Sequence, residues 1–262
     1  MKEYILLKND LKNYFSNFDA NISVSFYDLK EDYTFSFDGD KKMLSASMIK
    51  LLIMGAILEC INDGKYNLED NYIFADKHIV DGSGIVIDMD EGHKFSLREI
   101  IKLMIVLSDN SCTNLLIDIL SMKEINSYAK KLGLKNTVLE RKMMDFDAIE
   151  KGYNNYTSSN DIMNILKLIY GKKLVTEYLS DFAIEVLLSQ KLNYGLKNYL
   201  SEEVKLASKS GNLDGLENDG GIFFLDKVDY ILVVLVNNAK TNHLAKEIIN
   251  NISKITFDFM EG

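Results

Sequence analysis

The 262-residue chain contains no proline and no tryptophan, and it has only two cysteines and three histidines. Without proline, its turns must depend on glycine, asparagine and aspartate. Cys60 and Cys112 lie in apolar helical runs without Cys-x-x-Cys or metal-ligand spacing, so we expect buried free thiols rather than a disulfide. His78, His93 and His243 are far apart and have no ligand-like neighbours. We therefore expect no metal site and no cofactor.

Long hydrophobic runs are also absent. The longest candidate, Tyr230 to Val236, falls far short of the roughly 18 to 20 apolar residues of a membrane span, so we expect no membrane-spanning segment. Near the N-terminus the apolar run covers only residues 4–7, against roughly 7 to 15 residues in a secretory signal. As written, the sequence predicts a cytoplasmic protein. It would be extracytoplasmic if an export signal had been trimmed from it.

Positive charge is scarce as well. The formal net charge is -9, and the lysines are scattered rather than gathered into a stripe. This pattern argues against a surface for nucleic acid or for an anionic membrane. With 47% apolar residues, the chain can bury a substantial core as one domain or as two interleaved lobes, and we expect a monomer.

Hydrophobic periodicity predicts helices and strands along the whole chain. Apolar residues at three- and four-residue steps predict a helix over 2–18 that packs on a sheet, and alternation over 22–26 and 33–37 predicts a β-hairpin. Further helices are predicted at 47–61, 96–108, 111–120, 123–132, 158–170 and 181–189. Strands are predicted at 204–208, 221–225 and 230–237, followed by a helix from Asn242, its expected N-cap, to about 255.

Strands near both ends of the chain, with helices between them, predict an α+β fold. We expect one antiparallel sheet built from both termini, with flanking helices and an inserted all-α lobe. Residues 1–45 and 203–262 would form the α/β lobe and residues 46–202 the all-α lobe, together making one domain. A site is expected in the cleft between the lobes.

Ser-Met-Ile-Lys at 47–50 is the first candidate for chemistry. On a helix Ser47 and Lys50 share a face, so the amine can reach the weakly nucleophilic hydroxyl and act as its base. The apolar residues 51–58 predict that this helix is buried, and burial lowers the pKa of a lysine. Ser-Tyr-Ala-Lys at 127–130 has the same spacing without companion motifs, so this spacing alone identifies nothing.

Two further motifs follow in the sequence. Ser-Asp-Asn at 108–110 comes after the apolar run 103–107, and taken alone its simplest interpretation is a turn between helices. Lys-Ser-Gly at 209–211 ends the strand that starts near 204. A lysine there is commonly a solvated charge, but Gly211 leaves room for a ligand backbone to lie against the strand edge.

Taken together and in this order, the three motifs reproduce the set found in class A β-lactamases and penicillin-binding proteins. The sequence resembles class A β-lactamases over nearly its whole length, and residues 105–117 are the most specific stretch. This resemblance implies a β-lactamase/transpeptidase-like fold and a catalytic domain that acts through an acyl-enzyme. The implied partner is a small molecule, either a β-lactam or a D-alanyl peptide-like substrate.

The resemblance also implies roles for catalytic residues. Ser47 would attack the carbonyl, and Lys50 would share in removing its proton. Ser108 would pass a proton to the leaving nitrogen, and Lys209 would support Ser108.

A second implied group binds the substrate. Asn110 would hold the substrate amide, and Ser210, with the preceding lysine, would face the substrate carboxylate. Gly211 would keep the strand edge open, and the backbone N–H groups of Ser47 and Asn212 would form the oxyanion hole.

The resemblance fails at the group that clears the acyl-enzyme. Class A enzymes use a Glu in a pattern like Arg-x-Glu-x-x-Leu-Asn. If Arg141 is the family's Arg, the Glu position holds Met143 and the hydrolytic base is missing. Asp145, Asp147 and Glu150 are alternative acids that could activate water, and it is at least as reasonable that all three are solvated loop charges.

A second departure concerns the substrate carboxylate. Residues 213–221 contain Asp214, Glu217 and Asp219 but no arginine, which predicts an acidic rim that repels a carboxylate unless Lys209 dominates. Two classes of function therefore stay open. One is a β-lactam-opening enzyme with slow deacylation, or a D-alanyl peptidase or esterase of the same fold. The other is a sensor that holds a β-lactam or peptide as a long-lived adduct.

Overall fold

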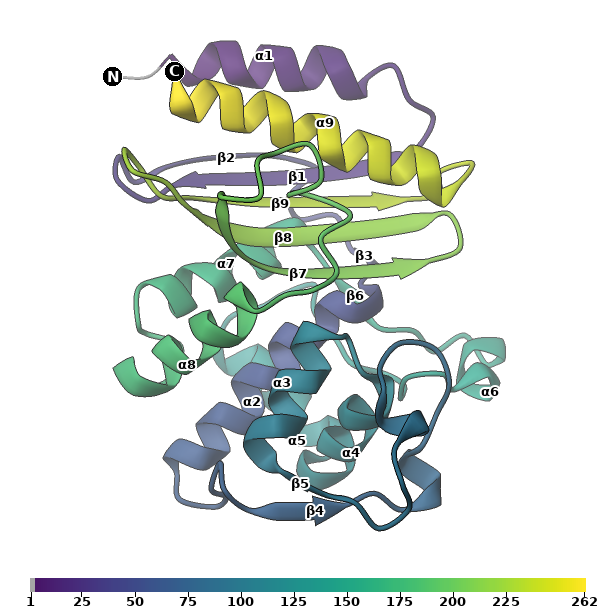
Figure 1. Cartoon of the computed structure of the whole chain (residues 1–262). Coiled ribbons are helices and arrows are strands. Elements are labelled where there is room, and N and C mark those ends of the chain that lie inside the picture. The colour runs from purple at the N-terminus through teal and green to yellow at the C-terminus, as the bar shows by residue number, and fades with distance from the viewer. Residues whose placement is uncertain (1–2) are drawn as a thin grey trace.

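The computed structural model describes residues 3–262 and has a five-stranded antiparallel sheet at its centre (Figure 1). Met1 and Lys2, where the first predicted helix and lobe begin, lie outside the described residues. The sheet has the order β2-β1-β9-β8-β7. Its strands are β1 (Asn21–Asp28), β2 (Tyr33–Phe37), β7 (Lys205–Leu213), β8 (Leu216–Phe224) and β9 (Tyr230–Asn237). The predicted α+β fold, with one sheet built from both ends of the chain, is confirmed.

Strand β9 is apolar throughout because both faces of the sheet are covered. Its residues alternate between two hydrophobic clusters: Tyr230, Leu232 and Val234 face one, and Ile231 and Val233 face the other. A strand buried on both faces needs no alternation of polar and apolar residues. The central strand therefore joins the two layers that flank the sheet.

Helices α1 (Tyr4–Phe15) and α9 (Asn242–Glu261) pack together on one face of the sheet (Figure 1). The predicted N-cap of α9 is wrong, because Thr241 caps the helix by accepting a hydrogen bond from Leu244 N at 3.1 Å. The Asn242 side chain instead donates to Leu213 O at 2.7 Å and accepts from Gly215 N at 3.1 Å. Asn242 thus holds the turn between β7 and β8.

The other face of the sheet carries the helical layer. Its helices are α2 (Lys50–Asn62), α3 (Leu97–Val106), α4 (Asn110–Leu120), α5 (Met122–Lys131), α6 (Phe146–Glu150), α7 (Ser159–Tyr170) and α8 (Glu177–Leu188), with 3-10 turns η1 (Ala46–Ile49), η2 (Asp76–His78) and η3 (Val86–Asp88). Helix α2 is buried along nearly its whole length, as its all-round apolar sequence predicts. Cys60 and Cys112 are free and buried, which confirms the prediction for both thiols.

The span 46–202 also contains strands that hydrophobic periodicity did not reveal. β4 (Asn71–Ile73) pairs with β5 (Lys94–Ser96), and β6 (Tyr156–Thr157) pairs with β3 (Met43–Leu44). Strands of two or three residues are too short to show alternation. The inserted region is therefore mainly helical rather than all-α, and the lobe boundaries proposed from the sequence stay a prediction.

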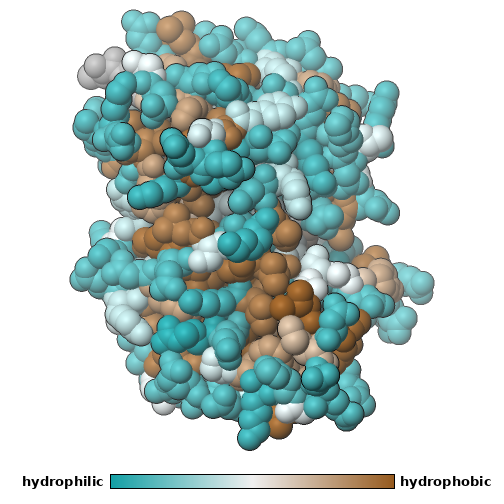
Figure 2. All heavy atoms as spheres, in the orientation of Figure 1, coloured by the Kyte–Doolittle hydropathy of each residue, from teal (hydrophilic) through white to brown (hydrophobic). Residues whose placement is uncertain are grey.

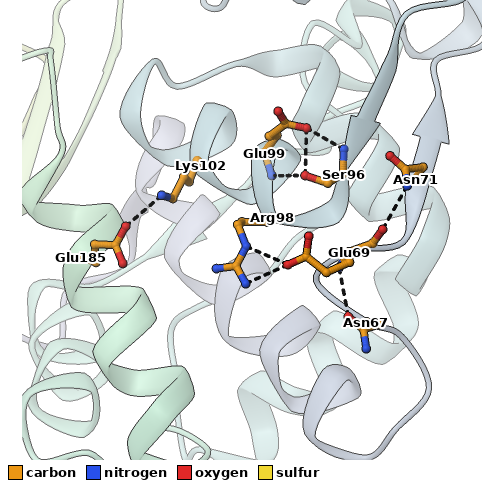
Figure 3. Close-up of polar contacts among 8 residues, drawn as sticks. All are labelled: Asn67, Glu69, Asn71, Ser96, Arg98, Glu99, Lys102 and Glu185. Atoms are coloured by element: carbon orange, nitrogen blue, oxygen red, sulfur yellow. Dashed lines mark hydrogen bonds and ion pairs between the residues drawn. The ribbon is translucent and has the colours of Figure 1, made fainter.

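Polar contacts fix the outer end of this region (Figure 3). Ser96 caps α3 by accepting from Glu99 N, and the Glu99 carboxylate accepts in return from Ser96 N at 2.8 Å. Arg98 binds Glu69 through Nε and Nη2, which ties α3 to the segment before β4. Lys102 reaches Glu185 on α8 at 2.8 Å. Within residues 3–262, no helix is both long and apolar enough to cross a membrane.

The predicted acidic rim after Lys-Ser-Gly is present only in part. Strand β7 runs on to Leu213, and β8 begins at Leu216, so most of the segment is a hairpin. Asp214 and Gly215, which has a φ of +65°, form its turn. Asp-Gly is a strong signal for a two-residue hairpin turn, since glycine adopts positive φ without strain. Glu217 and Asp219 are buried in β8 instead of exposed, but both line a cavity beside Ser210 and Gly211, so acidic groups do lie there as predicted.

We predict that Thr241→Ala destabilises the protein by about 1 kcal/mol, because the Leu244 N–H loses its side-chain acceptor. Urea unfolding followed by circular dichroism measures the change. Lys240→Ala, at the exposed neighbouring position, is the matched control, with an expected change within about 0.5 kcal/mol. Equal stability losses in the two variants would contradict the capping role of Thr241.

Candidate active site

Ser47 lies in the 3-10 turn η1, which leads into α2. This turn packs against strand β7. A Cβ atom added to Gly211 would lie 2.6 Å from Ser47 N and 3.0 Å from Met48 N. No side chain fits at such a distance, so only glycine permits this approach. The predicted helix over 47–61 therefore starts as a 3-10 turn, and its α-helical part begins at Lys50.

Lys50 is completely buried, and its amine faces the loop between α3 and α4. Nζ donates to Ser108 O at 2.5 Å, to Ser108 Oγ at 3.0 Å and to Asn110 Oδ1 at 2.9 Å. Within residues 3–262 it forms no hydrogen bond with the Ser47 hydroxyl, the contact that the sequence spacing allows. Burial, and then the charge of Lys209, lower the pKa of Lys50 well below its usual value. The predicted burial of Lys50 and the predicted lowering of its pKa therefore both agree with the structure.

The Ser-Asp-Asn motif is both a helix-helix turn and part of the site. Ser108 has a φ of +55°, an uncommon conformation for a residue with a side chain. Asp109 caps α4 by accepting from Cys112 N at 2.9 Å. Its other oxygen accepts from Ile85 N and Val86 N, which fixes the loop before α3. The turn interpretation and the functional interpretation therefore describe the same residues.

Lys209 approaches the same hydroxyl from the sheet. Its buried Nζ donates to Ser108 Oγ at 3.1 Å and to Ser210 O at 2.5 Å. Burial lowers the pKa of Lys209 to about 7, and attraction to Asp219 partly opposes this shift. Burial raises the pKa of Asp219 to about 7, although its carboxylate accepts from Leu196 N and Gly220 N. The Lys-Ser-Gly motif thus lies in the middle of β7 rather than at its end.

Two adjoining cavities, each of about 230 Å³, lie beside Ser47 and β7. Ser47 and Asn110 line the first, Ser210 and Gly211 line the second, and Asn212 lines both. In Figure 2, apolar side chains gather across the middle of the molecule, between the sheet and the helical layer. The structure therefore brings all the predicted catalytic and binding residues to one region, as expected for a cleft between layers.

The segment between the second and third motifs forms one wall of the first cavity. Met143 lines this cavity, and its backbone is held by the side chain of Asn114, which accepts at 2.8 Å and donates at 3.1 Å. Asp145 caps α6 through Ala148 N. The predicted alternative acids, Asp145, Asp147 and Glu150, are not among the residues that line the cavity. No carboxylate lines it within residues 3–262.

Sequence reasoning missed several residues of this site. Ser83 lines both cavities, Asn154 and Asn155 line the first, and Lys246 from α9 lines the second. The glycines around Ser83 were an available signal, since Gly82 and Gly84 both have positive φ. Nothing in the sequence connects Lys246 with β7, because only the packing of α9 on the sheet brings them together. Within residues 3–262, no group of three or more His, Cys, Asp or Glu is placed to hold a metal.

Serine enzymes that recognise penicillin carry these three motifs in this order, and the chain falls in that class. A family model described as the beta-lactamase enzyme family matches residues 6–260. The chain therefore belongs to this family and is a serine hydrolase.

Two curated relatives represent two activities within this class. A beta-lactamase from Bacteroides uniformis is 26% identical over 184 residues, which cover 65% of this chain and 62% of the relative. The D-alanyl-D-alanine carboxypeptidase DacF from Bacillus subtilis is 24% identical over 147 residues, which cover 54% of this chain and 36% of the relative. The chain thus matches less than two thirds of the length of either relative.

Solved structures agree with the fold over almost the whole chain. A beta-lactamase from Sphaerobacter thermophilus has a TM-score of 0.89 at 22% identity, covering 96% of this chain and 95% of that one. The structure of PBP-A has a TM-score of 0.90 at 22% identity, covering 97% and 96%. At this identity the likeness concerns the fold.

We predict that Lys209→Met stabilises the protein more at pH 6 than at pH 9. Because the pKa of Lys209 falls from 10.5 to about 7 on folding, the cost of burying its charge is fully present below pH 7 and fades as the pH rises toward 10.5. The gain in unfolding free energy should shrink by roughly 2 to 3 kcal/mol between these pH values. Urea unfolding at both pH values measures it.

Lys205→Met, at an exposed position on the same strand, is the control for the added apolar side chain. Its effect should be the same at both pH values. A Lys209→Met gain that grows with pH would contradict the assigned direction of the pKa shift.

Proposed function

We propose that this serine hydrolase opens β-lactam rings through an acyl-enzyme on Ser47 and releases the product slowly. The observation that carries the proposal is that two buried lysine amines bind the hydroxyl of Ser108 beside a cavity that contains Ser47 and is lined by no described carboxylate. The first feature favours acylation of the serine, and the second disfavours hydrolysis of the ester that results.

Acylation requires that the serine proton is moved to the leaving nitrogen. Lys50, whose pKa is held well below its usual value by burial, takes the proton of Ser47 as the oxygen attacks the carbonyl carbon. Ser108 then passes a proton to the lactam nitrogen and regains one from Lys50, to which it is already bonded at 3.0 Å. The carbon–nitrogen bond breaks, and a carbon–oxygen ester bond forms on Ser47.

Lys209 assists by holding the Ser108 hydroxyl at 3.1 Å, and its charge faces the leaving-group side of the site. The backbone N–H groups of Ser47 and Asn212 form the proposed oxyanion hole. The close approach of Gly211 to Ser47 N supports this assignment, because it brings β7 beside the start of η1. Loss of such a donor typically slows the reaction about 100- to 1000-fold.

Release of the acyl group requires activated water. A positioned general base typically contributes about 100- to 10,000-fold to such a step. If Arg141 is the family's Arg, Met143 stands at the position of the family's Glu. Met143 lines the cavity, and a thioether cannot take up a proton from water. The proposal is therefore fast acylation followed by a long-lived ester.

Hydrolysis of D-alanyl peptides is the second candidate. Met143 favours it, because this activity does not depend on the family's Glu, and one curated relative carries the name D-alanyl-D-alanine carboxypeptidase. Both candidates use the same acylation steps at Ser47. They differ in which acyl group leaves the serine quickly.

We predict that a penicillin or a chromogenic cephalosporin adds its full mass to the protein. The adduct on Ser47 should be hydrolysed much more slowly than it forms. Intact mass spectrometry over time and the absorbance of the cephalosporin measure adduct and turnover together. Ser47→Ala is the control and should give neither signal. Sustained turnover without an adduct would contradict slow release, and the absence of both signals would move the function to D-alanyl peptides, assayed by release of D-alanine.

We further predict that Met143→Glu shortens the lifetime of the adduct at least tenfold, since it puts a carboxylate on the wall of the cavity that contains Ser47. Met143→Gln has nearly the same size and no base, so it should leave the lifetime within about threefold of the parent protein. Equal lifetimes in the two variants would show that the missing base at position 143 is not the cause of slow release.

A further inference from the structure

Among residues 3–262, Arg141 is the only charged residue that lines the cavity containing Ser47. It is 7% exposed, and its guanidinium donates through Nε to Asn154 Oδ1 at 3.2 Å and through Nη1 to Lys142 O at 3.0 Å. Both acceptors are neutral. Nη2 forms no hydrogen bond with any residue from 3 to 262, and protein atoms do not fully enclose it.

A buried arginine is commonly paired with a carboxylate, because its charge otherwise loses hydration without compensation. Arg141 forms no ion pair within residues 3–262. The carboxylate that most affects it is Asp145, which lies beyond ion-pairing distance and uses Oδ1 to cap α6. Burial lowers the pKa of Arg141, but an arginine stays protonated in proteins. The wall of the cavity therefore contains a positive charge that has no ion-pair partner and keeps a free donor.

The same wall offers apolar surface to a ligand. Phe146 and Ile149, three residues apart on α6, line the cavity while 61% and 37% exposed, respectively. Asp147 and Glu150 on this helix do not line it. A ligand group with an apolar ring and a carboxylate would match both features, since the guanidinium fork binds a carboxylate with two parallel hydrogen bonds.

The reaction geometry decides which part of the substrate enters this cavity. Ser210, which the resemblance places against the carboxylate next to the lactam nitrogen, lines the second cavity and does not line this one. The cavity extends from Ser47 to α6, so it receives the acyl group that stays attached to the serine.

We infer that Arg141 is a specificity-determining residue that binds a carboxylate on the acyl side of the substrate, so that acyl groups combining an apolar ring with a carboxylate are preferred. The inference rests on the proposed acylation of Ser47. It adds a charged subsite on the side of the substrate opposite to the leaving group.

Benzylpenicillin and carbenicillin form a matched pair for the test, because carbenicillin differs by one carboxylate on the acyl side chain. The measured quantity is the ratio of their rate constants for acylation of Ser47, followed by intact mass. Arg141→Gln should lower the carbenicillin-to-benzylpenicillin ratio at least tenfold, the scale of one hydrogen bond between charged groups. An unchanged ratio would overturn the inference.

Asn154→Asp tests the same subsite without truncating a buried side chain. The new carboxylate would accept from Arg141 Nε and neutralise the cavity, so the ratio should fall in this variant too. This variant decides the matter if Arg141→Gln does not fold. Lys142→Gln is the control, because it removes a neighbouring cation that pairs with Asp118 and does not line the cavity. Its ratio should stay that of the parent protein.

Failure of the proposed function gives a different result. If neither penicillin acylates Ser47, the acylation proposal fails, but the subsite can still be tested. Phenylmalonic acid monoamide reproduces the acyl side chain of carbenicillin, and phenylacetamide reproduces that of benzylpenicillin. Titration of each followed by NMR should show at least tenfold tighter binding of the acid in the parent protein, lost in Asn154→Asp. Equal binding of the two compounds would overturn the inference by itself.

Discussion

Two buried lysines share one serine hydroxyl, and this constraint holds the site together. Lys50 comes from the helical layer and Lys209 from the sheet, and both amines lie within about 3 Å of Ser108 Oγ. Each amine also binds a backbone carbonyl, Ser108 O or Ser210 O. Burial lowers the pKa of both lysines, to about 7 for Lys209, and the charge of Lys209 lowers the pKa of Lys50 further.

The same constraint explains why the loop between α3 and α4 is strained and firmly anchored. Ser108 adopts a positive φ, and Asp109 fixes the turn by capping α4 and by accepting from two N–H groups of the 85–86 segment. Backbone strain of this kind persists only where the surrounding structure enforces it. Gly211 plays the complementary part on β7, where its missing side chain lets the strand reach Ser47 N.

The opposite wall of the cleft has a different character. Among residues 3–262 no acid lines it, Met143 is part of it, and Arg141 lies there without an ion pair beside apolar residues of α6. In the proposed mechanism, groups for proton transfer during acylation are therefore present, whereas this wall has no group that would activate water. In the mechanism and the subsite that we propose, this wall selects the acyl group, which separates specificity from chemistry around Ser47.

The sequence by itself determined the three motifs, the α+β fold and the burial of α2, because these depend on local periodicity and on residue types whose chemistry is specific. It misplaced the α9 cap and the β7–β8 hairpin, since Thr241 and Asn242 are equally good caps in isolation and the Asp-Gly turn was interpreted as part of an acidic loop. Tertiary structure alone decided that Lys50 binds Ser108 rather than Ser47, that Glu217 and Asp219 are buried, and that Arg141 faces the cavity. These outcomes depend on contacts between segments far apart in the chain, where packing and desolvation act and local sequence carries no information.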